Sequence, residues 1–136
     1  MAWVVDTCIL LDIGLDDPSF ADASENLLRR KLGEGLLVCP VTFIELAPAF
    51  HGQIKGLQEF LFQLGVDHLK DWTAADTLCA SRAWTLQVQR RQSQKTLKRP
   101  IADILIGAFA SRHQGLLTRN PNDFRKLFPS LHLVEP

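Results

Sequence analysis

The sequence contains no uninterrupted apolar run near the roughly 20 residues that a membrane-spanning helix requires, so no membrane span is expected. Its first residues also lack the basic stretch of a signal peptide, and they reach a carboxylate, Asp6, too early for one. The three cysteines lie far apart, and no cysteine–histidine spacing matches a zinc site. These absences predict a cytoplasmic protein whose cysteines are buried free thiols.

Signatures of several common chemistries are absent as well. The chain has no glycine-rich phosphate-binding loop and no Gly-x-Ser-x-Gly nucleophile turn. A phosphotransferase of the haloacid-dehalogenase type would need a second aspartate two residues after Asp6, where Cys8 stands. A receiver-type phosphoacceptor would need paired acids at the end of the first strand. None of the four histidines pairs with an obvious nucleophile, so we interpret them as structural.

The chain also has no net charge, but its charges are divided unevenly. Residues 1–76 carry 12 acidic and 5 basic side chains, a net of −7, whereas residues 77–136 carry 3 acidic and 10 basic ones, a net of +7. No acid lies between Asp76 and Asp103, a stretch that holds Arg82, Arg90, Arg91, Lys95, Lys98 and Arg99. Two interpretations fit this stretch: a solvated helix face followed by a basic loop, or a surface that follows nucleic-acid phosphates.

Apolar periodicity alternates between short strand-like and longer helix-like segments. It predicts strands at residues 2–5, 36–39, 66–69, 116–118 and 131–134, and helices at 6–13, 21–32, 42–50, 54–64, from 73 onward, 102–113 and 122–127. Pro40 is expected to break the second strand. The long helix is expected to begin with a Thr73/Asp76 capping box and to fray over 87–98. This order predicts one domain with a three-layer α/β/α sandwich and a mainly parallel central sheet.

Four acids lie where a strand-like run gives way to a helix-like run: Asp6, Glu45, Asp103 and Asp123, the last with Asn120 nearby. Each alone also fits a helix cap or first turn. Parallel sheets, however, build their sites at the carboxyl ends of strands. Carboxylates gathered there repel one another unless a cation such as Mg²⁺ or Mn²⁺ binds them. The group therefore predicts metal-assisted chemistry on a phosphate-containing substrate.

Four segments carry a family resemblance: residues 4–7, 42–46, 101–108 and 117–124. In this order and spacing they resemble the PIN-domain family, and most closely its VapC-type ribonuclease toxins of bacterial toxin–antitoxin pairs. The resemblance extends from residue 3 to about 134 and implies a single PIN-like domain over 1–136. It implies a parallel sheet flanked by helices, an acidic cluster that binds Mg²⁺ or Mn²⁺, and cleavage of RNA, single-stranded or structured, by metal-activated water.

The resemblance assigns roles residue by residue. Asp6 and Asp103 match the main metal ligands, and Glu45 matches the second acid, which holds metal or orients water. Asn120 and Asp123 both fall in the fourth motif, and we favour Asp123 as the catalytic acid with Asn120 as a further ligand. RNA contacts are predicted at Arg90, Arg91, Lys95, Lys98, Arg99 and Arg119. A cognate antitoxin and a homodimer are implied by resemblance only.

Two departures and two alternatives accompany this hypothesis. Cys8 stands where the family often has Asn or Ser, and Asn120 stands where it usually has an acid. A PIN fold with a weakened site would be an RNA-binding or interaction module, which metal-dependent RNA cleavage distinguishes from a nuclease. A housekeeping RNA-processing nuclease without an antitoxin is the other alternative. An adjacent small gene for a DNA-binding protein would argue against it.

Overall fold

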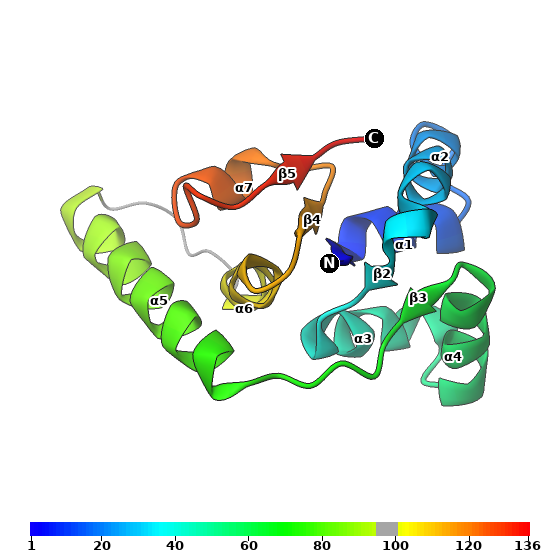
Figure 1. Cartoon of the computed structure of the whole chain (residues 1–136), viewed down its shortest axis with the longest axis horizontal. Helices are drawn as coiled ribbons and strands as arrows, with labels where there is room; N and C mark the ends of the chain where they lie inside the picture. Colours follow the sequence, from blue (N-terminus) through cyan, green and yellow to red (C-terminus); the bar gives the residue numbers. More distant parts are fainter. Residues whose placement is uncertain (95–100) are drawn as a thin grey trace.

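The computed structural model describes the backbone of residues 1–94 and 101–136, and the side chains of residues 1–90 and 101–136 (Figure 1). Its centre is a five-stranded sheet in the order β3-β2-β1-β4-β5, and every neighbouring pair is parallel. The strands are β1 (Trp3–Val5), β2 (Leu36–Leu37), β3 (Val66–Asp67), β4 (Gly115–Leu117) and β5 (Leu133–Val134). Because β1 pairs with both β2 and β4, its carboxyl end lies at the middle of the sheet edge.

Helices fill every connection between the strands. They are α1 (Thr7–Gly14), α2 (Ala21–Lys31), α3 (Pro40–Leu46), α4 (Ile54–Gln63), α5 (Ala74–Gln94), α6 (Ile101–Ser111) and α7 (Asn122–Arg125). Short 3-10 turns follow α2 (Leu32–Glu34) and α3 (Ala47–Phe50). The order of strands and α-helices agrees with the order that the hydrophobic pattern predicts.

The two faces of the sheet bury separate apolar cores. Trp3 and Val5 of β1 pack with Ile9, Leu10, Leu27, Leu57 and Leu61, which come from α1, α2 and α4. Val4, between them, points the other way, to Ile104, Ile106, Phe109 and Phe124 of α6 and α7. This alternation is the two-residue period of a strand that is buried on both sides. Figure 1 shows the sheet between α1, α2 and α4 on one side and α5, α6 and α7 on the other, which confirms the three-layer α/β/α sandwich.

Two local predictions are wrong. The third helix begins at Pro40 and not at residue 42. Proline suits the first helical position, because this position needs no N–H donor and matches the fixed φ of proline. Helix α5 does not fray from residue 87 but continues to Gln94. The Gln87 side chain is buried, and glutamine and arginine are good helix formers. Residues 95–98 of the predicted frayed stretch lie outside the described residues.

The predicted capping box is confirmed. Thr73 and Asp76 form the expected capping box, in which Asp76 Oδ2 accepts the Thr73 N–H at 2.9 Å and Thr73 Oγ1 accepts the Asp76 N–H at 3.3 Å. The cysteines are free as predicted, but only Cys39 is buried, and Cys8 and Cys79 are partly buried. No helix in the described part of the chain is both long and apolar enough to cross a membrane.

Candidate metal centre

Asp6 occupies the carboxyl end of the central strand. Its backbone N–H donates to Leu117 O at 2.9 Å, which continues the pairing of β1 with β4. Its side chain caps α1, because Oδ1 accepts the Thr7 N–H at 2.8 Å. Oδ2 accepts the Thr118 hydroxyl at 2.7 Å and lies 3.4 Å from Cys8 Sγ. Asp6 is only 6% exposed, and these three donors hold its carboxylate in the interior.

The surroundings of Asp6 disfavour its charge. Burial raises the pKa of this carboxyl above its ordinary value, and the nearby charge of Glu45 adds a smaller increase. Hydrogen bonds from Thr118, Cys8 and the Thr7 N–H lower the pKa but do not cancel the effect of burial. No basic side chain among the described residues forms an ion pair with Asp6. A bound cation would supply the missing charge, so Asp6 fits the role of a metal ligand.

Glu45 is brought to Asp6 through a threonine. It lies near the end of α3 with an exposed side chain. The Thr7 hydroxyl is 2.6 Å from Glu45 Oε1 and 3.0 Å from the buried Thr42 hydroxyl. Since Thr7 directly follows Asp6, this contact joins the first and second predicted acids at one edge of the sheet. The bridging Thr7 was not identified from the sequence, where nothing distinguishes it from any first-turn threonine.

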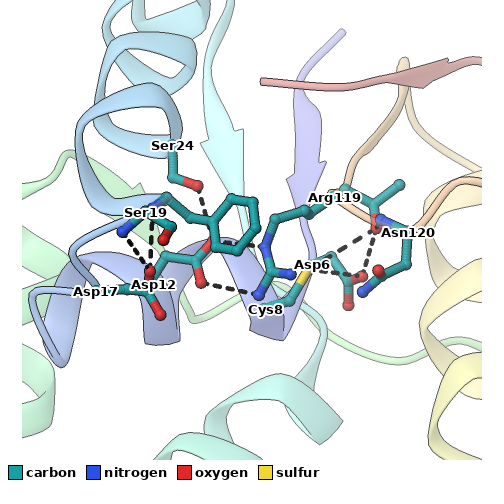
Figure 2. Close-up of polar contacts among 10 residues, drawn as sticks. Asp6, Cys8, Asp12, Asp17, Ser19, Ser24, Arg119 and Asn120 are labelled. Carbon is teal, nitrogen blue, oxygen red and sulfur yellow. Dashed lines mark hydrogen bonds and ion pairs between the residues drawn. The ribbon is translucent and has the colours of Figure 1, made fainter.

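The turn after β4 supplies the fourth motif. Thr118 is fully buried, and its Oγ1 accepts the Asn120 N–H at 3.0 Å. Asn120 itself is exposed, and Figure 2 shows its side chain beside the Asp6 carboxylate. Asn120 O accepts the Asp123 N–H at 3.2 Å, where α7 begins. The motif is thus linked to Asp6 by a chain of hydrogen bonds through Thr118.

Asp103 and Asp123 are placed relative to the other acids by the helices that bear them. Both are half-buried in the first turns of their helices, α6 and α7. Helix α6 contacts both β1 and α3, the elements that hold Asp6 and Glu45. Within the described residues, however, no three histidine, cysteine or acidic side chains form a group able to hold a metal ion. The structure joins Asp6 to Glu45 and to the Asn120 turn, and the complete ligand set stays a prediction.

A second buried aspartate, Asp12, was missed by sequence reasoning. Arg119 donates to it from Nε and Nη2, at 2.9 Å each, and the Ser24 hydroxyl donates to Asp12 Oδ2 at 2.9 Å (Figure 2). The Phe20 ring lies over the guanidinium, 4.1 Å from Cζ to the ring centroid. The available signal was an acid inside the apolar run of α1, because a buried carboxylate requires a partner.

Little of the predicted basic surface falls within the described residues. Arg90 is half-buried on α5, and its Nη2 donates to Lys126 O at 3.4 Å. Arg91 belongs to the same helix, but its side chain lies outside the described residues, as do Lys95, Lys98 and Arg99. RNA contact by this surface stays a prediction.

The PIN-domain family model matches residues 3–127. The chain belongs to the PIN-domain family. Members of this family are generally nucleases, which gives the coarse activity of the chain. The PIN domain is also similar to a chain of VapBC2 from Rickettsia felis, solved bound to a DNA fragment from their promoter. The TM-score is 0.71 with 20% sequence identity, over 99% of this chain and 98% of that chain, which shows a shared fold. No curated protein matches the sequence significantly.

The donor set of this PIN domain suits a hard divalent cation. PIN-domain nucleases generally depend on a divalent metal, and Asp6 and Glu45 present carboxylate oxygens of the kind that Mg²⁺ and Mn²⁺ prefer. Cys8 is a poor ligand for such a hard ion, which prefers oxygen to sulfur. Burial, with the Asp6 charge adding to it, raises the pKa of its thiol to about 12 in the metal-free protein. The protonated thiol is instead a weak donor to Asp6.

Proposed function

We propose that this PIN domain is a Mg²⁺- or Mn²⁺-dependent endoribonuclease that cleaves single-stranded RNA, and that it is the toxin of a VapBC-like toxin–antitoxin pair. The observation that carries the proposal is the state of Asp6. Asp6 is buried at the end of the central strand, and no basic side chain among the described residues forms an ion pair with it. A second carboxylate, Glu45, lies close to it. An ionised carboxylate that is buried without a partner is unfavourable, and a bound divalent cation would stabilise it.

The acids and Asn120 of the candidate site would have different roles in phosphodiester hydrolysis. A divalent ion, when bound, would polarise the scissile phosphate and offset the charge that develops on it. Asp6 and Asp103 would hold that ion, with Asn120 as a further ligand. Glu45 is exposed and oriented by the Thr7 hydroxyl, so it is suited to accept the proton of the attacking water. Asp123 is the second candidate for that proton, since it lies one hydrogen-bonded turn from Asn120.

The substrate is proposed from charge. The C-terminal part of the chain, residues 77–136, carries a net charge of +7. Arg90 and Arg91 belong to the C-terminal part of α5. In the sequence, Lys95, Lys98 and Arg99 follow them before α6, the helix that bears Asp103. Cations in this place suit the backbone of a single-stranded or structured RNA whose scissile phosphate reaches the acids.

An antitoxin and a second copy of the chain are the proposed partners. The similar Rickettsia felis structure is of VapBC2 on promoter DNA, which supports a paired antitoxin for this chain. The described surface also offers an apolar pocket of about 470 Å³ between α3, α5 and α6. Its walls include Ile44 and Ile101, both more than half exposed, and the indoles of Trp72 and Trp84. Exposed apolar side chains around such a pocket suit a protein partner.

The test is cleavage of a single-stranded RNA by protein stripped of metal and then given Mg²⁺, Mn²⁺ or Ca²⁺. Activity is expected with Mg²⁺ or Mn²⁺ and should be lost in Asp6→Asn. Asp22→Asn is the matched control, because Asp22 is an exposed first-turn acid of α2, away from the site. Asp123→Ala should lose more activity than Asn120→Ala, since only a carboxylate can take a proton.

One observation favours an alternative. The described residues contain no preformed group of three ligands, as expected for a PIN-fold RNA-binding module with a weakened site. Such a module would bind RNA without cleaving it under any metal, and its affinity would be the same in Asp6→Asn. That result would replace the nuclease proposal.

A further inference from the structure

Two neighbouring residues after β4 hold helix α1 at two points. Thr118 Oγ1 donates to Asp6 Oδ2 at 2.7 Å, at the residue that caps the helix. Arg119 donates to both oxygens of Asp12, at 2.9 Å each, six residues further along the chain. At a rise of about 1.5 Å per residue, these points lie about 9 Å apart along the helix axis. The turn after β4 is therefore fixed to α1 in both position and direction.

The Asp12–Arg119 pair is largely enclosed on the Asp12 side, while the Arg119 side chain keeps 30% exposure. Asp12 is 3% exposed, and its Oδ2 also accepts the Ser24 hydroxyl. The Phe20 ring covers one face of the guanidinium. The backbone N–H of Phe20 donates to Asp17 Oδ1 at 3.0 Å. Figure 2 shows the Arg119 guanidinium pointing to the Asp12 carboxylate. A bidentate pair of this kind fixes orientation as well as distance.

We propose that Asp12 and Arg119 are positioning residues, whose ion pair sets the Thr118–Asn120 turn against Asp6, and that Arg119 is not a contact for RNA phosphate. The inference rests on the proposed nuclease function, because it concerns the same site. It replaces our sequence-based expectation that Arg119 binds RNA.

The mechanical link from the pair to the site is short. Thr118 Oγ1 donates to Asp6 and also accepts the Asn120 N–H, and Asn120 O accepts the Asp123 N–H. Any movement of the turn therefore displaces Asn120 and Asp123 relative to Asp6. A displacement of about 1 Å in an active site can reduce the rate by about 100-fold.

The experiment compares this pair with a matched ion pair elsewhere. Arg112 binds Asp76 with the same two-bond geometry, at 2.9 Å each, and Asp76 is likewise buried. That pair joins the residue after α6 to the start of α5, and its hydrogen bonds within the described part of the chain do not reach the site. The variants are Asp12→Asn and Arg119→Lys, with Asp76→Asn and Arg112→Lys as controls.

Four quantities are measured for each variant: the melting temperature, Mn²⁺ affinity by calorimetry, kcat and KM on single-stranded RNA, and hydrogen exchange of the Asn120 amide without metal. All four variants should melt at lower temperature. In Asp12→Asn and Arg119→Lys, kcat should fall by about 10- to 100-fold at unchanged KM. Their Mn²⁺ affinity should also fall, and the Asn120 amide should exchange faster. The controls should keep wild-type kcat, Mn²⁺ affinity and Asn120 exchange.

Three results would overturn the inference. The first is wild-type kcat and Mn²⁺ affinity in folded Asp12→Asn. The second is an effect of Arg119→Lys confined to KM and to the salt dependence of RNA binding, which would make Arg119 a phosphate contact. The third is unchanged Asn120 exchange in both variants. If wild-type protein neither binds Mn²⁺ nor cleaves RNA, the proposed function fails, and the exchange measurement still decides whether the ion pair holds the turn.

Discussion

Replacing Asp6 with asparagine should stabilise the metal-free protein at neutral pH. Burial, with a contribution from Glu45, raises the pKa of this carboxyl, so the folded state resists its ionisation. Asparagine keeps the helix cap, because its Oδ1 still accepts the Thr7 N–H. The Thr118 hydroxyl can rotate to accept from the new amide, since a hydroxyl oxygen has two lone pairs. The substitution therefore removes an unfavourable charge at small structural cost.

The sign of the pH dependence follows from the direction of the shift. Below the ordinary aspartate pKa of about 3.9, Asp6 is neutral in both states and the two proteins should be equally stable. As pH rises from there through the raised pKa of the folded state, the unfolded chain ionises first and wild type loses stability. Above that window the difference is constant. Its expected size is about 1–3 kcal/mol, the usual cost of burying an uncompensated polar group.

Urea unfolding in a chelator between pH 4 and pH 8 measures this difference. Adding Mn²⁺ should reverse the order, since ligand at 1,000 times its Kd stabilises the binding protein by about 4.1 kcal/mol and leaves Asp6→Asn unchanged. Asp12→Asn is the control, because it leaves Arg119 without its ionic partner and should lower stability. Lower stability of Asp6→Asn than wild type at pH 7, or a difference independent of pH, would refute the reasoning.

Three further outcomes are expected. Gly107→Ala should lower the unfolding free energy by about 1–3 kcal/mol in thermal melts, because its Cβ would lie 2.3 Å from the buried Phe128 ring. Asp76→Ala should cost about 2–3 kcal/mol near neutral pH, since it removes the carboxylate that accepts the Thr73 N–H in the capping box and leaves the partly exposed Arg112 without its ionic partner. Burial opposes ionisation of Asp76, but its bonds to Arg112 and Thr73 hold its pKa below the ordinary value, so this contribution should be lost as pH falls below about 4. Arg90→Ala should reduce the log–log salt slope of RNA binding by about 0.7, and an unchanged slope would remove Arg90 from the RNA surface.

The fold was predictable because its strongest determinants are local. The run Trp3–Val5 is apolar at every position, which is the pattern of a strand buried on both faces. Helical periodicity and chain breaks gave the remaining elements in the right order. The errors at Pro40 and Gln87 have different causes. At Pro40 a local rule applies, because proline suits the first position of a helix. The burial of Gln87 is decided by tertiary packing, which the local sequence does not show.

The site was only partly predictable, for a related reason. Asp6 and Glu45 were found because strand ends in a parallel sheet gather at one edge, a rule that needs no side-chain detail. The Asp12–Arg119 pair joins residues separated by 107 positions, and nothing local marks either as the other's partner. The sequence therefore offers Arg119 only as a predicted RNA contact at the edge of the site.

Helix α1 carries two buried aspartates in opposite electrostatic states. Asp12 has a bidentate arginine and a serine hydroxyl, so its charge is compensated within the protein. Asp6 has only neutral donors, and a second carboxylate, Glu45, lies near it. If both acids served the fold alone, the uncompensated Asp6 would lower the stability of the folded state with no compensating function. The proposed site gives a reason for the uncompensated carboxylate, since a divalent cation and the phosphate of a substrate would balance its charge there.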